Sequence, residues 1–150
     1  MGAEKSLQKA ISHHKAGETI KAEKLYRAIL SEDLKQPDAN HNLGVLLKQR
    51  NQLEAALGYF KTALEAHPNQ SQFWISYIDT LITLGQFDTA KNIIKKGQSN
   101  GLEENRVDQF TARIKSESKT TRSKKKTLQT AIKPHRLLAR AKSHAKKGEA

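Results

Sequence analysis

The sequence repeats itself at an interval of 34 residues, and this recurrence constrains the possible folds more than any other feature. Small residues and turn-forming residues stand in the same register three times, as Ala22, Ala56 and Ala90, and as Gly17, Asn51 and Gly85. Glycine and asparagine tolerate the left-handed backbone that ends many helices. Three copies in register predict three structural units that stack on one another to bury a shared core.

The clearest copy lies between Pro37 and Pro68 and contains two amphipathic helical patterns. Spacings of three and four place the apolar side chains of each pattern on one stripe. These side chains are Leu43, Leu46 and Leu47 in the first helix, and Ala56, Leu57, Phe60, Ala63 and Leu64 in the second. Gly44 is small and falls in the middle of the first helix, so we expect Phe60 to fill the space beside it.

This pattern resembles the tetratricopeptide repeat, a helix–turn–helix unit of about 34 residues. The tryptophan that the family usually has early in the first helix is Asn40 here, whereas the next unit has Trp74 at the equivalent position. The resemblance implies an all-α fold: a right-handed α-solenoid of three helix–turn–helix repeats plus a capping helix, followed by a basic tail.

The repeat register also sets the expected boundaries. We expect a tetratricopeptide repeat domain over residues 4–116, with repeats at about 3–36, 37–70 and 71–104 and a capping helix over 102–116, on which Arg106 and Arg113 face water. Residues 117–133 begin with ESKTTRSKKK, a polar and basic composition that predicts a flexible linker. Residues 134–150 contain SHAKKGE, which matches SHHKAGE of the first repeat. They are therefore expected to form the first helix of an incomplete further repeat, within the N-terminal part of a larger protein.

Positive charge is concentrated near the end of the sequence. The chain has a net charge of +12, and residues 115–150 alone carry twelve Lys or Arg against two Glu. Such a segment could bind nucleic acid or another anionic surface through its phosphates. It has no aromatic residue to stack on bases, which argues against nucleic acid as the partner.

The composition excludes several classes of function. The chain has no cysteine, and neither a paired-carboxylate motif nor a metal or phosphate signature is present. The adjacent His13 and His14 point about 100° apart on a helix and cannot easily share a metal. We therefore expect no enzyme activity, no cofactor and no metal. Because no apolar run approaches a membrane span, we expect a cytoplasmic protein; its oligomeric state is left open.

The first helices of such units line the concave face of the stack, which commonly binds extended peptides. A polar track at the repeat spacing is the best candidate for peptide binding, with Asn42 as its central residue, although Asn42 could instead bond a neighbouring helix. We expect His41 and Asn42 to point away from the core of the helix pair. The predicted groove residues are Gln8, Ile11, His14, His41, Asn42, Val45, Lys48, Ile75, Ser76 and Asp79.

Three narrower resemblances bear on the partner. In domains that clamp the C-terminal carboxylate of chaperone tails, five Lys, Asn and Arg residues form the clamp, and only Asn42 matches them. The asparagine ladder of protein O-GlcNAc transferases is likewise matched by Asn42 but not by Gln8 and Ser76. Residues 5–115 are similar to bacterial arrays that precede glycosyltransferase or sulfotransferase domains. The sequence thus predicts a protein–protein interaction module for a peptide or protein ligand, with a transferase recruitment arm as the alternative.

Overall fold

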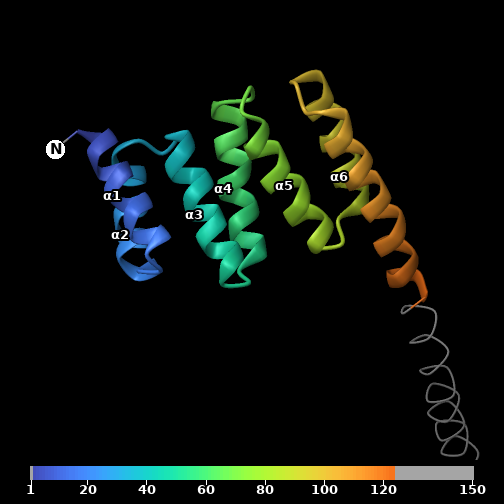
Figure 1. The fold of residues 1–150 in the computed structure, drawn as a ribbon, viewed down its shortest axis with the longest axis horizontal. Coiled ribbons are helices and arrows are strands. Elements are labelled where there is room, and N and C mark those ends of the chain that lie inside the picture. Colours follow the sequence, from blue (N-terminus) through green and yellow to red (C-terminus); the bar gives the residue numbers. More distant parts are fainter. Residues whose placement is uncertain (1, 124–150) are drawn as a thin grey trace, which may run out of the picture. The chain divides into compact units, whose positions relative to one another are not determined.

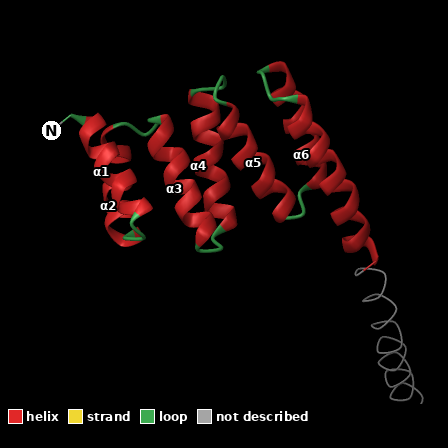
Figure 2. Cartoon of the chain, in the orientation of Figure 1, coloured by secondary structure: helices red, strands yellow, loops and turns green. Residues whose placement is uncertain are grey.

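The computed structural model describes residues 2–123, which contain seven helices and no strand (Figure 2). Six are α1 (Ala3–Lys15), α2 (Thr19–Glu32), α3 (Pro37–Gln49), α4 (Leu53–Ala66), α5 (Ser71–Thr83) and α6 (Phe87–Ser99), and the seventh covers residues 104–123. Within residues 2–123, every helix is too short or too polar to span a lipid bilayer. The predicted further repeat at 134–150 lies outside the described residues, as does the predicted linker from residue 124 onwards.

The chain divides into two units after Arg113, and the helix pairs belong to the first, Met1–Arg113. Within it, α1 pairs with α2, α3 with α4 and α5 with α6, and each pair packs on the next in chain order (Figure 1). This arrangement confirms the predicted all-α repeat array.

Each pair turns at the residue that the sequence pattern singles out. Gly17, Asn51 and Gly85 have φ of 80°, 60° and 77°, in the left-handed region that favours glycine and asparagine. The amide of the turn residue and the amide after it both donate to carbonyls of the helix that is ending. At the first turn these bonds are Gly17 to His14 and Glu18 to His13, at 3.0 and 2.8 Å. The three turns therefore share one hydrogen-bond pattern, and the local sequence determines it.

The pairs approach closely where small residues meet large ones. Gly44 and the fully buried Phe60 confirm the predicted contact, because a Cβ atom at position 44 would lie 2.5 Å from Cε1 of the Phe60 ring. Gly97 plays a similar part inside α6, where an added Cβ would lie 3.0 Å from Leu102 and 3.3 Å from Trp74. The helix α6 continues past Gly97 and ends at Ser99.

The seventh helix is longer than predicted. Residues 117–123 are helical, so the expected linker does not begin at residue 117. This segment contains neither proline nor glycine, and its hydroxyl groups bond back to the helix: Thr120 to the Ser116 carbonyl at 3.2 Å and Thr121 to the Glu117 carbonyl at 3.0 Å. The polar composition of this segment therefore did not mark the end of the helix.

Candidate functional site

The first helices of the three pairs lie nearest to one another. Among α1 to α6, the backbone of α3 comes close to those of α1 and α5, whereas the backbones of the second helices, α2 with α4 and α4 with α6, stay farther apart. A stack of helix pairs curves toward the side on which its helices are closest. We call the exposed side of α1, α3 and α5 the inner face, and the exposed side of α2, α4 and α6 the outer face. All ten predicted groove residues belong to the three inner helices.

Several of these residues bind the adjacent repeat instead of standing free. His14 of α1 donates from Nε2 to the Gln49 side-chain oxygen at 3.0 Å, and its Nδ1 accepts from the Tyr26 hydroxyl at 3.2 Å. One imidazole therefore joins the two helices of the first pair to the first helix of the second. His14 holds repeats together as well as lining the inner face.

His41 is buried, which corrects the expectation that it points away from the core. Its side chain is hydrogen-bonded to the hydroxyl of Ser76 at 2.8 Å, and Ser76 is buried too. The imidazole lies against two core rings, with centroid distances of 4.8 Å to Phe73 and 5.5 Å to Phe60. Burial lowers the pKa of His41 from its ordinary value of 6.5, so the fold favours the neutral imidazole. His41 and Ser76 are therefore structural links between α3 and α5.

An ionic cluster joins α3, α5 and the seventh helix. Asp79 of α5 accepts hydrogen bonds from Lys48 of α3 and from Arg113 of the seventh helix, and Arg113 also donates to the Thr83 hydroxyl at 2.9 Å. Partial burial by itself would raise the pKa of Asp79, but the bonds from Lys48 and Arg113 outweigh it and hold that pKa below 3.8. Arg113 thus binds Asp79 and is only partly exposed, whereas it was predicted to face water.

Lys48 and Arg113 also line a basic pocket at the C-terminal end of the inner face. The pocket has a volume of about 320 Å³. Its remaining polar lining comes from Gln72, Ser76, Asp79, Arg106 and Gln109, and its apolar lining from Ile75 and Phe110. Three cationic side chains against one carboxylate give the pocket an excess of positive charge, although the repeats as a whole are close to neutral.

Four of these lining residues were missed because the seventh helix was interpreted as a cap. The repeat register contains the signal that could have identified them. Thirty-four residues after Gln72, Ile75, Ser76 and Asp79 come Arg106, Gln109, Phe110 and Arg113. The start of the seventh helix therefore occupies the place of the first helix of a fourth unit, and it extends the inner face.

A family model of the tetratricopeptide repeat matches residues 13–74 and 49–114, which together span more than half of the chain. The chain belongs to the tetratricopeptide repeat family. The second match includes residues 104–113, in agreement with the repeat register of the seventh helix. No protein of curated function matches the sequence.

Solved tetratricopeptide structures share the fold at low sequence identity. The TPR2B domain of yeast Sti1, in complex with pHsp70, is 16% identical with a TM-score of 0.67, and the match covers 77% of this chain and 97% of that one. The Sgt2 domain of Aspergillus fumigatus is 20% identical with a TM-score of 0.66, covering 80% and 82%. The first such domain of Spaghetti (RPAP3), bound to the HSP90 peptide SRMEEVD, is 13% identical with a TM-score of 0.65, covering 79% and 92%.

In this tetratricopeptide array, five predicted residues are at least partly exposed on the inner face. Gln8 is exposed, and the other four, Ile11, Asn42, Val45 and Ile75, are partly exposed. Asn42 provides a side-chain amide that can donate and accept, as a peptide backbone requires. Within residues 2–123, no three His, Asp or Glu side chains come together as metal ligands. The available chemistry of the inner face is therefore hydrogen bonding, apolar contact and positive charge.

Proposed function

We propose that this chain is a protein-interaction module that binds an extended peptide along its inner face and takes an acidic group of that peptide in the basic pocket. The observation that carries the proposal is the pocket itself. Lys48 and Arg113 are both oriented by Asp79, so their positions are fixed before any ligand arrives. Preorganised charges bind with less loss of side-chain entropy than mobile ones.

Arg106 supplies the charge that the peptide would meet first. Its guanidinium is exposed, and among residues 2–123 its one hydrogen bond is a 3.5 Å contact to the Gln109 side chain. A guanidinium can donate two parallel bonds to a carboxylate, which adds geometric specificity to the attraction. Arg106 is therefore the pocket residue best placed to select an acidic group.

The rest of the inner face suits the peptide chain that leads to this group. Gln8 and Asn42 stand 34 residues apart on α1 and α3, so their amides can pair with successive stretches of an extended backbone. Ile11, Val45 and Ile75 are partly exposed beside them and provide apolar contacts for alternate side chains. This combination of backbone pairing and side-chain contacts is typical of peptide recognition.

The structural relatives support the same class of ligand. One of them is bound to the peptide SRMEEVD, which is acidic near its end, and another is in complex with pHsp70. The carboxylate clamp is not part of this proposal, because only Asn42 of its residues is present in this chain. The proposed contacts to the anion come from Lys48, Arg106 and Arg113 instead. A cytoplasmic location, a transferase recruitment role and binding through the basic tail stay predictions from the sequence.

A peptide selection followed by a charge-matched pair of variants tests the proposal. Random dodecapeptides would be selected on the full chain, and the affinity of an enriched peptide would be measured by fluorescence anisotropy. Arg106→Glu should weaken binding at least about tenfold, a loss of roughly 1.4 kcal/mol. Lys61→Glu changes the net charge equally on the outer helix α4 and should have little effect. Equal weakening by both variants would show that net charge alone attracts the peptide and would contradict the proposal.

A further inference from the structure

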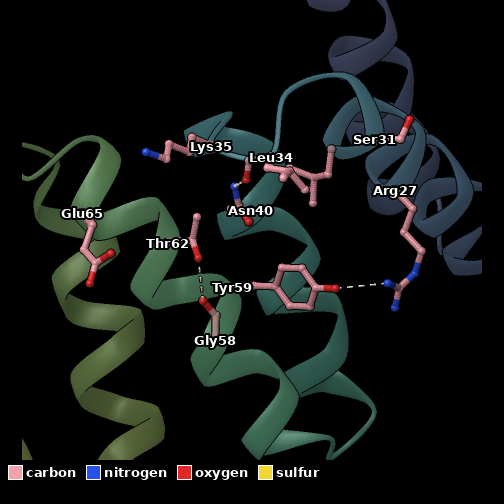
Figure 3. A pocket seen from close by; sticks show the side chains of 10 residues that line it. Arg27, Ser31, Leu34, Lys35, Asn40, Gly58, Tyr59, Thr62 and Glu65 are labelled. Carbon is pink, nitrogen blue, oxygen red and sulfur yellow. Dashed lines mark hydrogen bonds between the residues drawn. The ribbon is translucent and has the colours of Figure 1, made fainter.

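A second cavity lies on the outer face, between α2 and α4 (Figure 3). It has a volume of about 650 Å³, twice that of the basic pocket. Leu34, Tyr59 and Gly58 border it, and Arg27 spans one end by donating to the Tyr59 hydroxyl at 3.1 Å. The guanidinium also lies 6.0 Å from the centre of the Tyr59 ring, a cation–π distance that fixes the ring as a wall of the cavity.

The same cavity recurs one repeat further along the chain, between α4 and α6, but there it is about 340 Å³. Adding 34 to the residue numbers of the first cavity reproduces most of the lining of the second. The pairs that decide the comparison are Leu30 with Leu64, Leu34 with Pro68, Asn40 with Trp74, and Tyr59 with Ile93. The two equivalent cavities can therefore be compared within one chain, the larger between α2 and α4 and the smaller between α4 and α6.

Trp74 fills the second cavity with an indole ring. It is 5% exposed, and its Nε1 donates to the carbonyl of Pro68 at 2.7 Å. Asn40 makes the equivalent hydrogen bond in the first cavity, where its Nδ2 donates to the carbonyl of Leu34 at 2.9 Å, but its side chain has no ring. The first cavity thus keeps the polar contact of the tryptophan site and lacks the aromatic group.

Two further residues are unusual for a surface that nothing covers. Leu34 is 77% exposed, one of two large apolar side chains so exposed in the described part of the chain. Gly58 lies within α4, where glycine is unfavourable, yet a Cβ atom there would meet nothing within 4 Å. Packing therefore does not require a glycine at this position, and its missing side chain leaves the cavity open.

We propose that the cavity between α2 and α4 binds a tryptophan side chain of a partner protein. In the equivalent cavity between α4 and α6, the indole ring of Trp74 occupies the position that Asn40 leaves without a ring. The guest ring would lie against Tyr59 and Leu34, in the space that Gly58 leaves open. This site is on the outer face, so it is independent of peptide binding along the inner helices.

The test is a titration of the full-length, ¹⁵N-labelled protein with N-acetyl-L-tryptophanamide, followed by NMR. Saturable shifts are expected at the amides of Leu34, Gly58 and Thr62, with no such shifts from N-acetyl-L-alaninamide. Gly58→Leu fills the open space and should weaken binding at least about tenfold. The matched control is Asn92→Leu, because Asn92 is the exposed residue 34 positions after Gly58, and binding should be unchanged.

Asn40→Trp provides a second variant that does not depend on the first. It supplies the indole from the chain itself, so it should abolish binding of the probe and raise the melting temperature. The proposal is overturned if the wild type shows no saturable shifts at these amides, if the shifts centre on Trp74, or if Asn40→Trp binds the probe as the wild type does. If Gly58→Leu fails to fold, the Asn40→Trp result decides.

Discussion

Replacing Gly44 with alanine tests the packing of the central repeat most sharply. The new Cβ atom would lie 2.5, 2.7 and 3.1 Å from Cε1, Cδ1 and Cζ of Phe60. Non-bonded carbon atoms pack at about 3.5–4.0 Å, so the ring would have to move by roughly 1 Å. Phe60 is fully buried and has the His41 ring 5.5 Å away, which leaves no open side toward which it can move.

Two opposing effects determine how Gly44→Ala changes the free energy of unfolding. Overpacking a core costs about 1–3 kcal/mol, whereas replacing glycine by alanine inside a helix gains about 0.5–1 kcal/mol. We expect a net loss of about 1 kcal/mol, which would lower the melting temperature of a domain of this size by about 3–5 °C. The sign of this change is the informative result, because the same substitution without the clash would stabilise the protein.

Urea denaturation followed by far-ultraviolet circular dichroism would measure this effect. Gly58→Ala is the matched control: it is the same change in a helix interior with nothing within 4 Å, and it should stabilise by about 0.5–1 kcal/mol. In a Phe60→Leu background, Gly44→Ala should also become stabilising, because the ring that it meets is gone. If Gly44→Ala stabilises the wild type as Gly58→Ala does, the proposed contact with Phe60 is wrong.

Three other changes test the core and the inner face. Asp79→Asn should lower the free energy of unfolding by about 1 kcal/mol at neutral pH, because it releases Lys48 and Arg113. The pKa of Asp79 is lowered in the folded protein, so the wild type should keep this advantage above pH 3.8 and lose it as the pH falls through the lowered pKa. Denaturation at several pH values would measure it. His41→Phe should flatten the pH dependence below pH 6.5, where the unfolded wild-type chain takes up a proton that the buried imidazole resists; an unchanged profile would contradict the burial. Ala56→Leu should cost about 1–3 kcal/mol through overpacking of a fully buried position, and an unchanged melting curve would refute this.

The sequence predicts the repeat architecture well because local features determine it. Gly17, Asn51 and Gly85 end their helices with positive φ, and the apolar stripes between them keep one register. A residue that must adopt a left-handed conformation is recognisable without knowledge of its neighbours in space. The helix pairs follow from these turns.

The inner face was only partly predictable, because the adjacent repeat determines the burial and the hydrogen-bond partners of its side chains. His41 is polar in the sequence, yet the rings of Phe60 and Phe73 and the hydroxyl of Ser76 enclose it. Arg113 was expected in water, yet Asp79 of the preceding inner helix binds it. A helical pattern gives the direction of a side chain on its own helix, but it does not give the partner that another repeat places there.

Photo-crosslinking from Asn42 tests most directly whether the inner face binds a peptide. A benzophenone amino acid would replace Asn42 on α3 and, in a parallel protein, the exposed Lys61 on α4. Each would be irradiated with the selected peptide. Peptide binding along the inner face predicts a crosslink from position 42 that excess unlabelled peptide suppresses, and none from position 61. A crosslink from position 61 alone would place the peptide on the outer face and contradict the proposed function.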